Sequence, residues 1–163
     1  MKHTIAVLVK DHPGVLARVS SLFNRRRFNI ESIAAGHSEK KGVTRITIIV
    51  GGDESVLEQI TKQLNKLVDV IRVRDLPKRN SVERELALIK VQTKSVEQRA
   101  EIMQLVEIFR ANIVDIDQKA LTIEMTGTEE KINAKLKLLE SFGIIEISRT
   151  GKIALSRGPE KIM

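Results

Sequence analysis

The sequence lacks cysteine, tryptophan and tyrosine altogether among its 163 residues. Without a thiol, the chain can form no disulfide framework, no zinc–thiolate site and no cysteine nucleophile. Aromatic residues make up only 2% of the chain, and all of them are phenylalanine. Because proteins that hold single-stranded nucleic acid stack bases on aromatic rings, this composition argues against that class of partner.

Long hydrophobic runs are also missing. The apolar stretch that follows Met1-Lys2-His3 already ends at Lys10. A membrane-spanning helix needs about 20 apolar residues, and the core of a signal peptide also needs a longer run than this one. We therefore expect a soluble, cytoplasmic protein with no membrane partner.

The residue clusters that are typical of catalytic and metal sites do not occur either. The sequence has three histidines: His3, His12 and His37. None of them lies three or four residues from another histidine or from a glutamate in the pattern of helical metal ligands. Gly51-Gly52 is not followed by the lysine and hydroxyl of a phosphate-binding loop, and no serine lies in a nucleophile elbow. The sequence predicts no catalytic residue, no metal site and no cofactor held by this chain.

Basic residues are in excess, 28 against 21 acidic ones, which gives a net charge of +7. Such a balance is compatible with an acidic partner. The basic residues are dispersed rather than gathered in a stripe, however, and RNA-binding domains of ferredoxin-like fold carry aromatic rings on their central strands. The corresponding strands are aliphatic here, so an RNA-binding module is only an alternative.

One pattern of strands and helices occurs twice along the chain. In the first half, periodicity predicts strands over 4–9, 29–38, 43–50 and 68–74 and helices over 14–26 and 54–67. In the second half, it predicts strands over 86–93, 113–117, 121–126 and 143–149 and helices over 96–110 and 128–142. The order strand–helix–strand–strand–helix–strand is that of a ferredoxin-like βαββαβ unit. We therefore predict an α+β protein of two tandem units, with domains at 1–76 and 84–158, a linker at 77–83 and a C-terminal tail at 159–163.

The first and third strands of the first half carry apolar residues on both faces. A sheet with helices on one side only should present polar residues on the other side. The second apolar face therefore needs a cover, either the other half of this chain or another chain. We expect a homodimer in which the first unit joins its copy.

The turn Asp11-His12-Pro13-Gly14 connects the first strand to the first helix. Pro13 suits the first helical turn, and Gly14, which has no Cβ, lets a ligand approach the backbone. The free N–H groups at the start of a helix attract an anion, although a turn that binds nothing would have a similar sequence.

If the turn binds a ligand, the surrounding residues suit an aliphatic amino acid. The free amides at the helix start would hold its carboxylate. Asp11 and Asn29 could accept hydrogen bonds from its ammonium group. Apolar contact is offered by Val15, Leu16, Ile30 and Ile33.

The segment from Asp11 to Val19 resembles the opening motif of ACT domains, small-molecule sensors of amino-acid metabolism. Other stretches are similar to the regulatory small subunits of acetolactate synthase (acetohydroxyacid synthase). These stretches are Phe28–Ile33, Gln63–Val70, Glu83–Leu86 and Leu155–Gly158. The resemblance runs from Met1 to about Gly158, and the first unit is identified by it as an ACT domain.

This resemblance implies a regulatory function in the biosynthesis of branched-chain amino acids. The chain itself would do no chemistry, but would bind and activate a catalytic large subunit that uses thiamine diphosphate, Mg²⁺ and FAD. It would also bring about feedback inhibition by valine or another branched-chain amino acid, bound between two ACT units. The implied contacts are Asp11, Pro13, Gly14, Val15 and Leu16 of one chain with Asn29 and Ile30 of its partner.

One departure from the family pattern matters. Relatives often have Asn at position 11, whereas Asp11 attracts an ammonium group and repels a carboxylate. The second unit lacks the Pro-Gly signature, so we expect it to bind no amino acid in the same way. A free-standing ACT sensor that acts on another enzyme or on transcription is the alternative to a synthase subunit.

Overall fold

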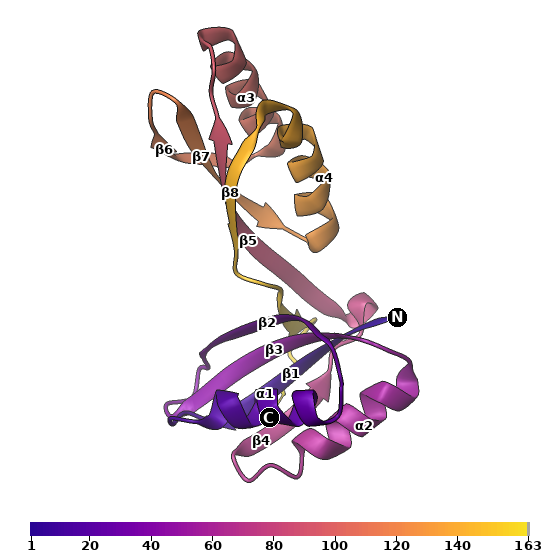
Figure 1. Cartoon of the computed structure of the whole chain (residues 1–163). Coiled ribbons are helices and arrows are strands. Elements are labelled where there is room, and N and C mark those ends of the chain that lie inside the picture. The colour runs from indigo at the N-terminus through magenta and orange to yellow at the C-terminus, as the bar shows by residue number, and fades with distance from the viewer. Residues whose placement is uncertain (163) are drawn as a thin grey trace. The chain divides into compact units, whose positions relative to one another are not determined.

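The computed structural model describes residues 1–162 and contains two compact units (Figure 1). The first unit comprises Met1–Glu83 together with the chain from Lys152 onward, and the second comprises Arg84–Gly151. Each unit is an α+β fold with the element order βαββαβ, as the sequence predicts. None of the helices in residues 1–162 is long and apolar enough to span a bilayer.

The first unit is a four-stranded antiparallel sheet with two helices on one face (Figure 1). Its elements are β1 (Lys2–Lys10), α1 (Val15–Arg25), β2 (Ile30–His37), β3 (Val43–Gly51), α2 (Glu54–Leu64) and β4 (Val70–Asp75). The strand order is β2-β3-β1-β4, so β1 and β3 are central and β2 and β4 form the edges.

The helix-covered face of this sheet holds the main core. Ile5, Val7 and Val9 alternate along β1 and are fully buried. They pack against the apolar stripe of α1, whose buried residues lie three or four positions apart, as an amphipathic helix requires. The residues of that stripe are Val15, Val19, Leu22 and Phe23.

The opposite face of the sheet is covered by the C-terminal segment of the same chain. Ala6 and Leu8 of β1 and Val43 of β3 are buried there, although they point away from the helices. Ala154, which lies in β9 (Ile153–Ser156), and Ile162 pack against them. The cover is thus supplied by the chain itself, one of the two possibilities that the apolar pattern left open.

Hydrogen bonds fix this segment to the sheet. The Arg45 guanidinium donates to the Ala154 carbonyl at 2.7 Å, and the Arg74 guanidinium donates to the Lys161 carbonyl at 2.7 Å. The Lys152 ammonium lies 3.1 Å from the buried Glu83 carboxylate, which also accepts a hydrogen bond from the Thr4 hydroxyl at 2.9 Å. The buried carboxylate is therefore both paired and hydrogen-bonded, as burial of a charge requires.

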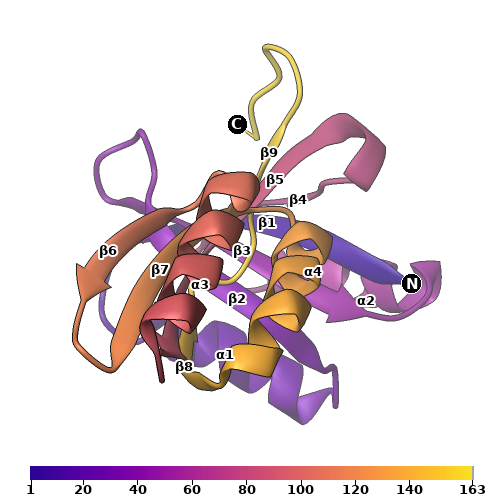
Figure 2. The same cartoon turned by 90° about the horizontal axis from the view of Figure 1, so that it is seen from above.

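The second unit repeats the topology. Its elements are β5 (Ser81–Gln92), α3 (Val96–Phe109), β6 (Asn112–Ile116), β7 (Ala120–Gly127), α4 (Glu129–Leu139) and β8 (Ile144–Arg149). The strand order is β6-β7-β5-β8, and α3 and α4 lie on one face (Figure 2).

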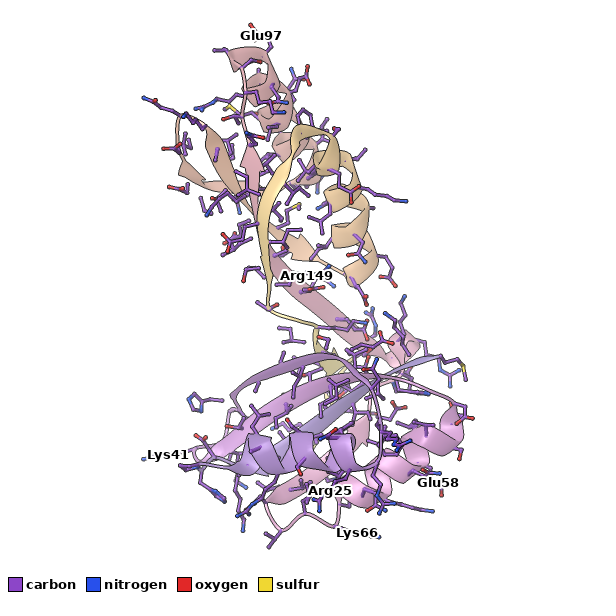
Figure 3. All side chains as sticks on the ribbon, viewed as in Figure 1. Arg25, Lys41, Glu58, Lys66, Glu97 and Arg149 are labelled. Carbon is purple, nitrogen blue, oxygen red and sulfur yellow. The ribbon has the colours of Figure 1, made fainter. Side chains whose placement is uncertain are left out.

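The free face of the second sheet is polar, unlike that of the first. Lys90 of β5 pairs with Glu146 of β8 at 3.2 Å, and the Asn112 amide donates to Glu124 at 3.2 Å. A face of this composition can be solvated and needs no cover. On the opposite, helix-covered face, Arg149, labelled in Figure 3, binds the buried Glu85 carboxylate through two nitrogens, at 2.5 and 2.8 Å.

Two boundaries differ from those expected. The stretch 77–83 contains a 3₁₀ turn (Lys78–Asn80) and the start of β5 rather than a linker without secondary structure. The segment after Gly151, expected in the second domain and tail, packs with the first unit because Ala154 and Ile162 complete its outer apolar layer.

We predict that Ile162→Ala destabilises the first unit by about 2 kcal/mol, because the truncation removes buried apolar contact with the sheet. Ile162 is only 6% exposed, whereas Leu155 in the same segment is 61% exposed. Leu155→Ala is therefore the matched control and should change the free energy of unfolding by much less. Urea unfolding of both variants measures the difference, and equal effects would contradict the packing role of Ile162.

Candidate functional site

The turn between β1 and α1 has a fixed backbone path. The Asp11 N–H donates to the Gly42 carbonyl at 2.9 Å, and the His12 N–H donates to the Lys10 carbonyl at 3.2 Å. Lys41, which precedes Gly42, is labelled in Figure 3 and locates this end of the unit. The turn is thus held against the β2–β3 hairpin.

Gly14 is the N-cap of α1 and lies in the left-handed region, with φ +89° and ψ −11°. The prediction that Pro13 occupies the first helical turn is wrong, because α1 starts only at Val15. The chain reverses direction at Gly14, and only a residue without Cβ adopts this conformation at little cost. An added Cβ at Gly14 would meet no atom within 4 Å, so the backbone at the start of the helix is open on that side.

The start of α1 has an unusual electrostatic character. Asp53 caps α2 by accepting from the Val56 N–H at 2.9 Å, and Ser95 caps α3 by accepting from the Gln98 N–H at 3.1 Å. The start of α4 has no side-chain cap but carries Glu129 and Glu130. Of the four α-helices in residues 1–162, α1 alone has neither a side-chain cap nor an acid in its first turn. Its first N–H groups are therefore suited to an external anion.

A buried carboxylate, that of Asp69, is hydrogen-bonded to the turn and to the first helix. Asp69, in the loop between α2 and β4, accepts a hydrogen bond from His12 Nε2 at 2.8 Å and another from the Arg18 guanidinium. Burial raises the pKa of the Asp69 carboxyl, but the hydrogen bonds and charges of His12 and Arg18 outweigh this, so the pKa lies below its usual range. The Asp69 carbonyl also accepts from the Lys10 N–H at 2.9 Å.

The apolar residues expected around the ligand divide into two groups. The Val15 side chain is buried in the main core, and Ile30 packs against that core, so these two side chains are largely occupied within the unit. Leu16 is 48% exposed and Ile33 is 37% exposed. At the turn itself, Val15 can contribute its N–H group and Leu16 its side chain.

Asn29 and Ile30 lie at the other end of the sheet from this turn. Ile30 pairs with Val50, which pairs with His3 near the start of β1. The turn begins after Lys10, at the end of β1 where Val43 pairs. Because a strand rises about 3.3 Å per residue, the length of β1 separates the two groups. One chain does not bring them together.

Asp11 faces a second histidine. His37 Nδ1, at the end of β2, lies 3.3 Å from the Asp11 carboxylate, and both side chains are solvent-accessible. The side chain of Asp11 is therefore close to the mouth of the helix and remains available to a cationic group.

The remaining chemistry-bearing residues form no further site within residues 1–162. No group of three or more His, Cys, Asp or Glu residues in that range is placed to hold a metal ion. Phe23 and Phe28 pack edge to face in the first core, with their ring centroids 6.3 Å apart. These rings are accordingly not displayed for base stacking.

Comparison with known proteins identifies the family. The model for the small subunit of acetolactate synthase matches residues 84–158, and that for the AHAS small subunit-like ACT domain matches residues 5–72. The acetolactate synthase small subunit of Mycolicibacterium smegmatis is 54% identical over 160 residues, which cover 98% of this chain and 94% of that protein. The chain belongs to the acetolactate synthase small subunit family.

Other members of the small subunit family agree along the whole chain. The probable acetolactate synthase small subunit of Methanothermobacter thermautotrophicus is 57% identical over 156 residues, covering 96% of this chain and 93% of that protein. The crystal structure of the small subunit from Thermotoga maritima has a TM-score of 0.92 and 44% identity, covering 98% of this chain and 99% of that one. The family resemblance and the ACT nature of the first unit are confirmed.

We predict that Gly14→Ala costs this small subunit about 1 kcal/mol of stability, because an L-residue pays for the left-handed conformation. An added Cβ at Gly14 meets no atom within 4 Å, so the cost comes from the backbone alone. Gly36→Ala is the matched control, since its Cβ also meets nothing within 4 Å and its φ is ordinary. Thermal unfolding of the two variants separates the cost of the left-handed backbone from the other effects of an added methyl group. Equal stabilities of the two variants would refute the cost of the left-handed conformation.

Proposed function

We propose that this chain is the regulatory subunit of an acetolactate synthase, which activates the catalytic large subunit and transmits feedback inhibition by valine or another branched-chain amino acid. Family membership supports acetolactate synthase as the enzyme that this chain regulates. The uncapped start of α1 supports an amino acid as the ligand, because its free N–H groups can bind a carboxylate. The thiamine diphosphate, Mg²⁺ and FAD that the resemblance implies would belong to the catalytic subunit, which joins two 2-oxo acids. This chain supplies recognition and not chemistry.

The two charged ends of an amino acid fit different groups of the turn. The carboxylate would accept hydrogen bonds from the amides at the start of α1, where the helix dipole is positive. The ammonium group would donate to Asp11, which lies at the same mouth. The aliphatic side chain would contact Leu16, which is exposed.

The polar contacts must supply much of the binding free energy, because burial of the aliphatic side chain alone is too weak. Burial of a valine side chain contributes about 1.5–3 kcal/mol. A dissociation constant near 10⁻⁵–10⁻⁴ M needs about 5.5–7 kcal/mol. The charged ends must therefore contribute several kcal/mol net.

The site would be completed by a second copy of the chain. β2 is an edge strand with an unpaired side. If two β2 edges paired in antiparallel fashion, Ile30 and Asn29 of one chain would lie beside the His37 end of the other. Asp11 is within 3.3 Å of His37, so the two halves of the predicted site would meet. This geometry supports a homodimer through the ACT unit.

Regulation would follow from the position of the ligand between two chains. An amino acid that bridges the chains favours the arrangement in which both halves of its site are in place. If the catalytic subunit favours another arrangement, a coupling free energy of about 1–3 kcal/mol changes its affinity for this chain 5- to 150-fold when the amino acid binds.

A mixed dimer tests the composite site. Gly14→Asp places a carboxylate where that of valine should bind and should abolish binding, whereas Gly14→Asn, of equal size but neutral, is the matched control. Asn29→Ala should weaken binding by about 1–3 kcal/mol through loss of a charge-assisted hydrogen bond. A dimer of one Gly14→Asp chain and one Asn29→Ala chain then retains one intact site and one doubly altered site.

Calorimetry on dimers purified through two different affinity tags should give one valine of normal affinity per mixed dimer. A site within a single chain would leave no intact site in that dimer. Absence of the normal-affinity component would therefore contradict the composite arrangement.

Co-expression tests the enzyme partner. The catalytic subunit of acetolactate synthase from the same source should co-purify with this chain and gain activity, which valine should then lower. A chain that purifies alone and leaves the synthase activity unchanged would instead favour a free-standing ACT sensor.

A further inference from the structure

Asp69 connects three parts of the candidate site, although no role was expected for it. Its side chain is only 7% exposed, yet it holds His12 from the turn and Arg18 from α1. Its carbonyl holds the amide of Lys10, the last residue of β1. The backbone before the turn, the turn itself and the first helix are thus all hydrogen-bonded to Asp69.

Both ring nitrogens of His12 have a partner. Nε2 lies 2.8 Å from the Asp69 carboxylate, and Nδ1 lies 3.2 Å from the Pro13 carbonyl. These two contacts fix the imidazole ring between Asp69 and the backbone of the turn. The side chain is 42% exposed, so the contact with Asp69 is made at the edge of the unit.

We propose that Asp69 is a positioning residue for the amino-acid site: through His12 and Arg18 it orders the turn and the start of α1, so that ligand affinity falls when these contacts are lost. This inference rests on the proposed function of the turn. The N–H groups at the start of α1 can hold the carboxylate of the ligand together only while this backbone is ordered.

The contacts of Asp69 differ in their exposure. Its carboxylate is only 7% exposed, whereas the Arg18 side chain on α1 is 57% exposed and that of His12 is 42% exposed. Each partner can therefore be replaced from the solvent side without altering the main core. His37 on β2 contacts Asp11 and not Asp69, so replacement of His12 leaves that pair in place.

Three variants and one control test the inference. Asp69→Asn removes the charge at nearly constant shape. His12→Gln retains a donor but never carries a charge, and Arg18→Gln removes the second partner from the exposed side, where folding is least at risk. Asp75→Asn is the matched control: it makes the same change at the far end of β4, opposite Ile5 and away from the turn.

The first measurement needs no ligand. Amide hydrogen exchange of residues 11–16 in the full chain should be faster in Asp69→Asn than in the wild type, and unchanged in Asp75→Asn. The second is valine affinity by calorimetry. Asp69→Asn should bind valine about fivefold more weakly than the wild type, whereas Asp75→Asn should bind like the wild type. His12→Gln and Arg18→Gln should each weaken binding by less, because each removes only one of the two contacts of the carboxylate.

The outcomes separate the two proposals. Unchanged exchange in Asp69→Asn, or wild-type valine affinity in that variant, would overturn this inference while valine binding by the wild type upholds the proposed function. A wild-type chain that binds no branched-chain amino acid would overturn the proposed function and, with it, the ligand part of the inference. If Asp69→Asn does not fold, the His12 and Arg18 variants decide the matter by the same measurements.

Discussion

The first unit depends on the burial of β1 on both faces. Every residue from His3 to Val9 is buried, so this strand requires a layer on each side. Helices α1 and α2 supply one layer, and the C-terminal segment supplies the other through Ala154 and Ile162. β1 ends at Lys10, and the turn of the candidate site begins at the next residue, Asp11. The position of the candidate site therefore depends on the burial of β1 between its two layers.

Periodicity predicted the order of elements well, because an amphipathic pattern survives wherever one face of an element is buried. The C-terminal segment was harder to predict. Ala154 and Ile162 are separated by Gly158 and Pro159 and follow no helical or strand repeat over that stretch. They are buried because they pack against the outer face of the first sheet, whose residues lie far from them in the sequence. A local sequence pattern cannot predict such a contact.

The candidate site was predictable in its location but not in its details. The motif from Asp11 to Gly14 pointed to the helix start, which the structure leaves uncapped. Whether Val15 faces a ligand or the core depends on how α1 is rotated on the sheet, and packing decides that rotation. Asp69 lies in a stretch that is similar to the small subunits, but the sequence alone assigns it no role, because only the fold brings it next to His12. Its one signal in the sequence is an acid between two apolar residues, Val68 and Val70.

The C-terminal cover also has a consequence for biosynthesis of the protein. A ribosome makes β1 before the second unit and the segment that starts at Lys152 after it, so the outer apolar layer of the first unit stays open until translation has passed through the whole second unit. During that interval Ala6, Leu8 and Val43 are available to chaperones or to other nascent chains. The first unit is thus closed by residues that follow the second unit in the order of synthesis.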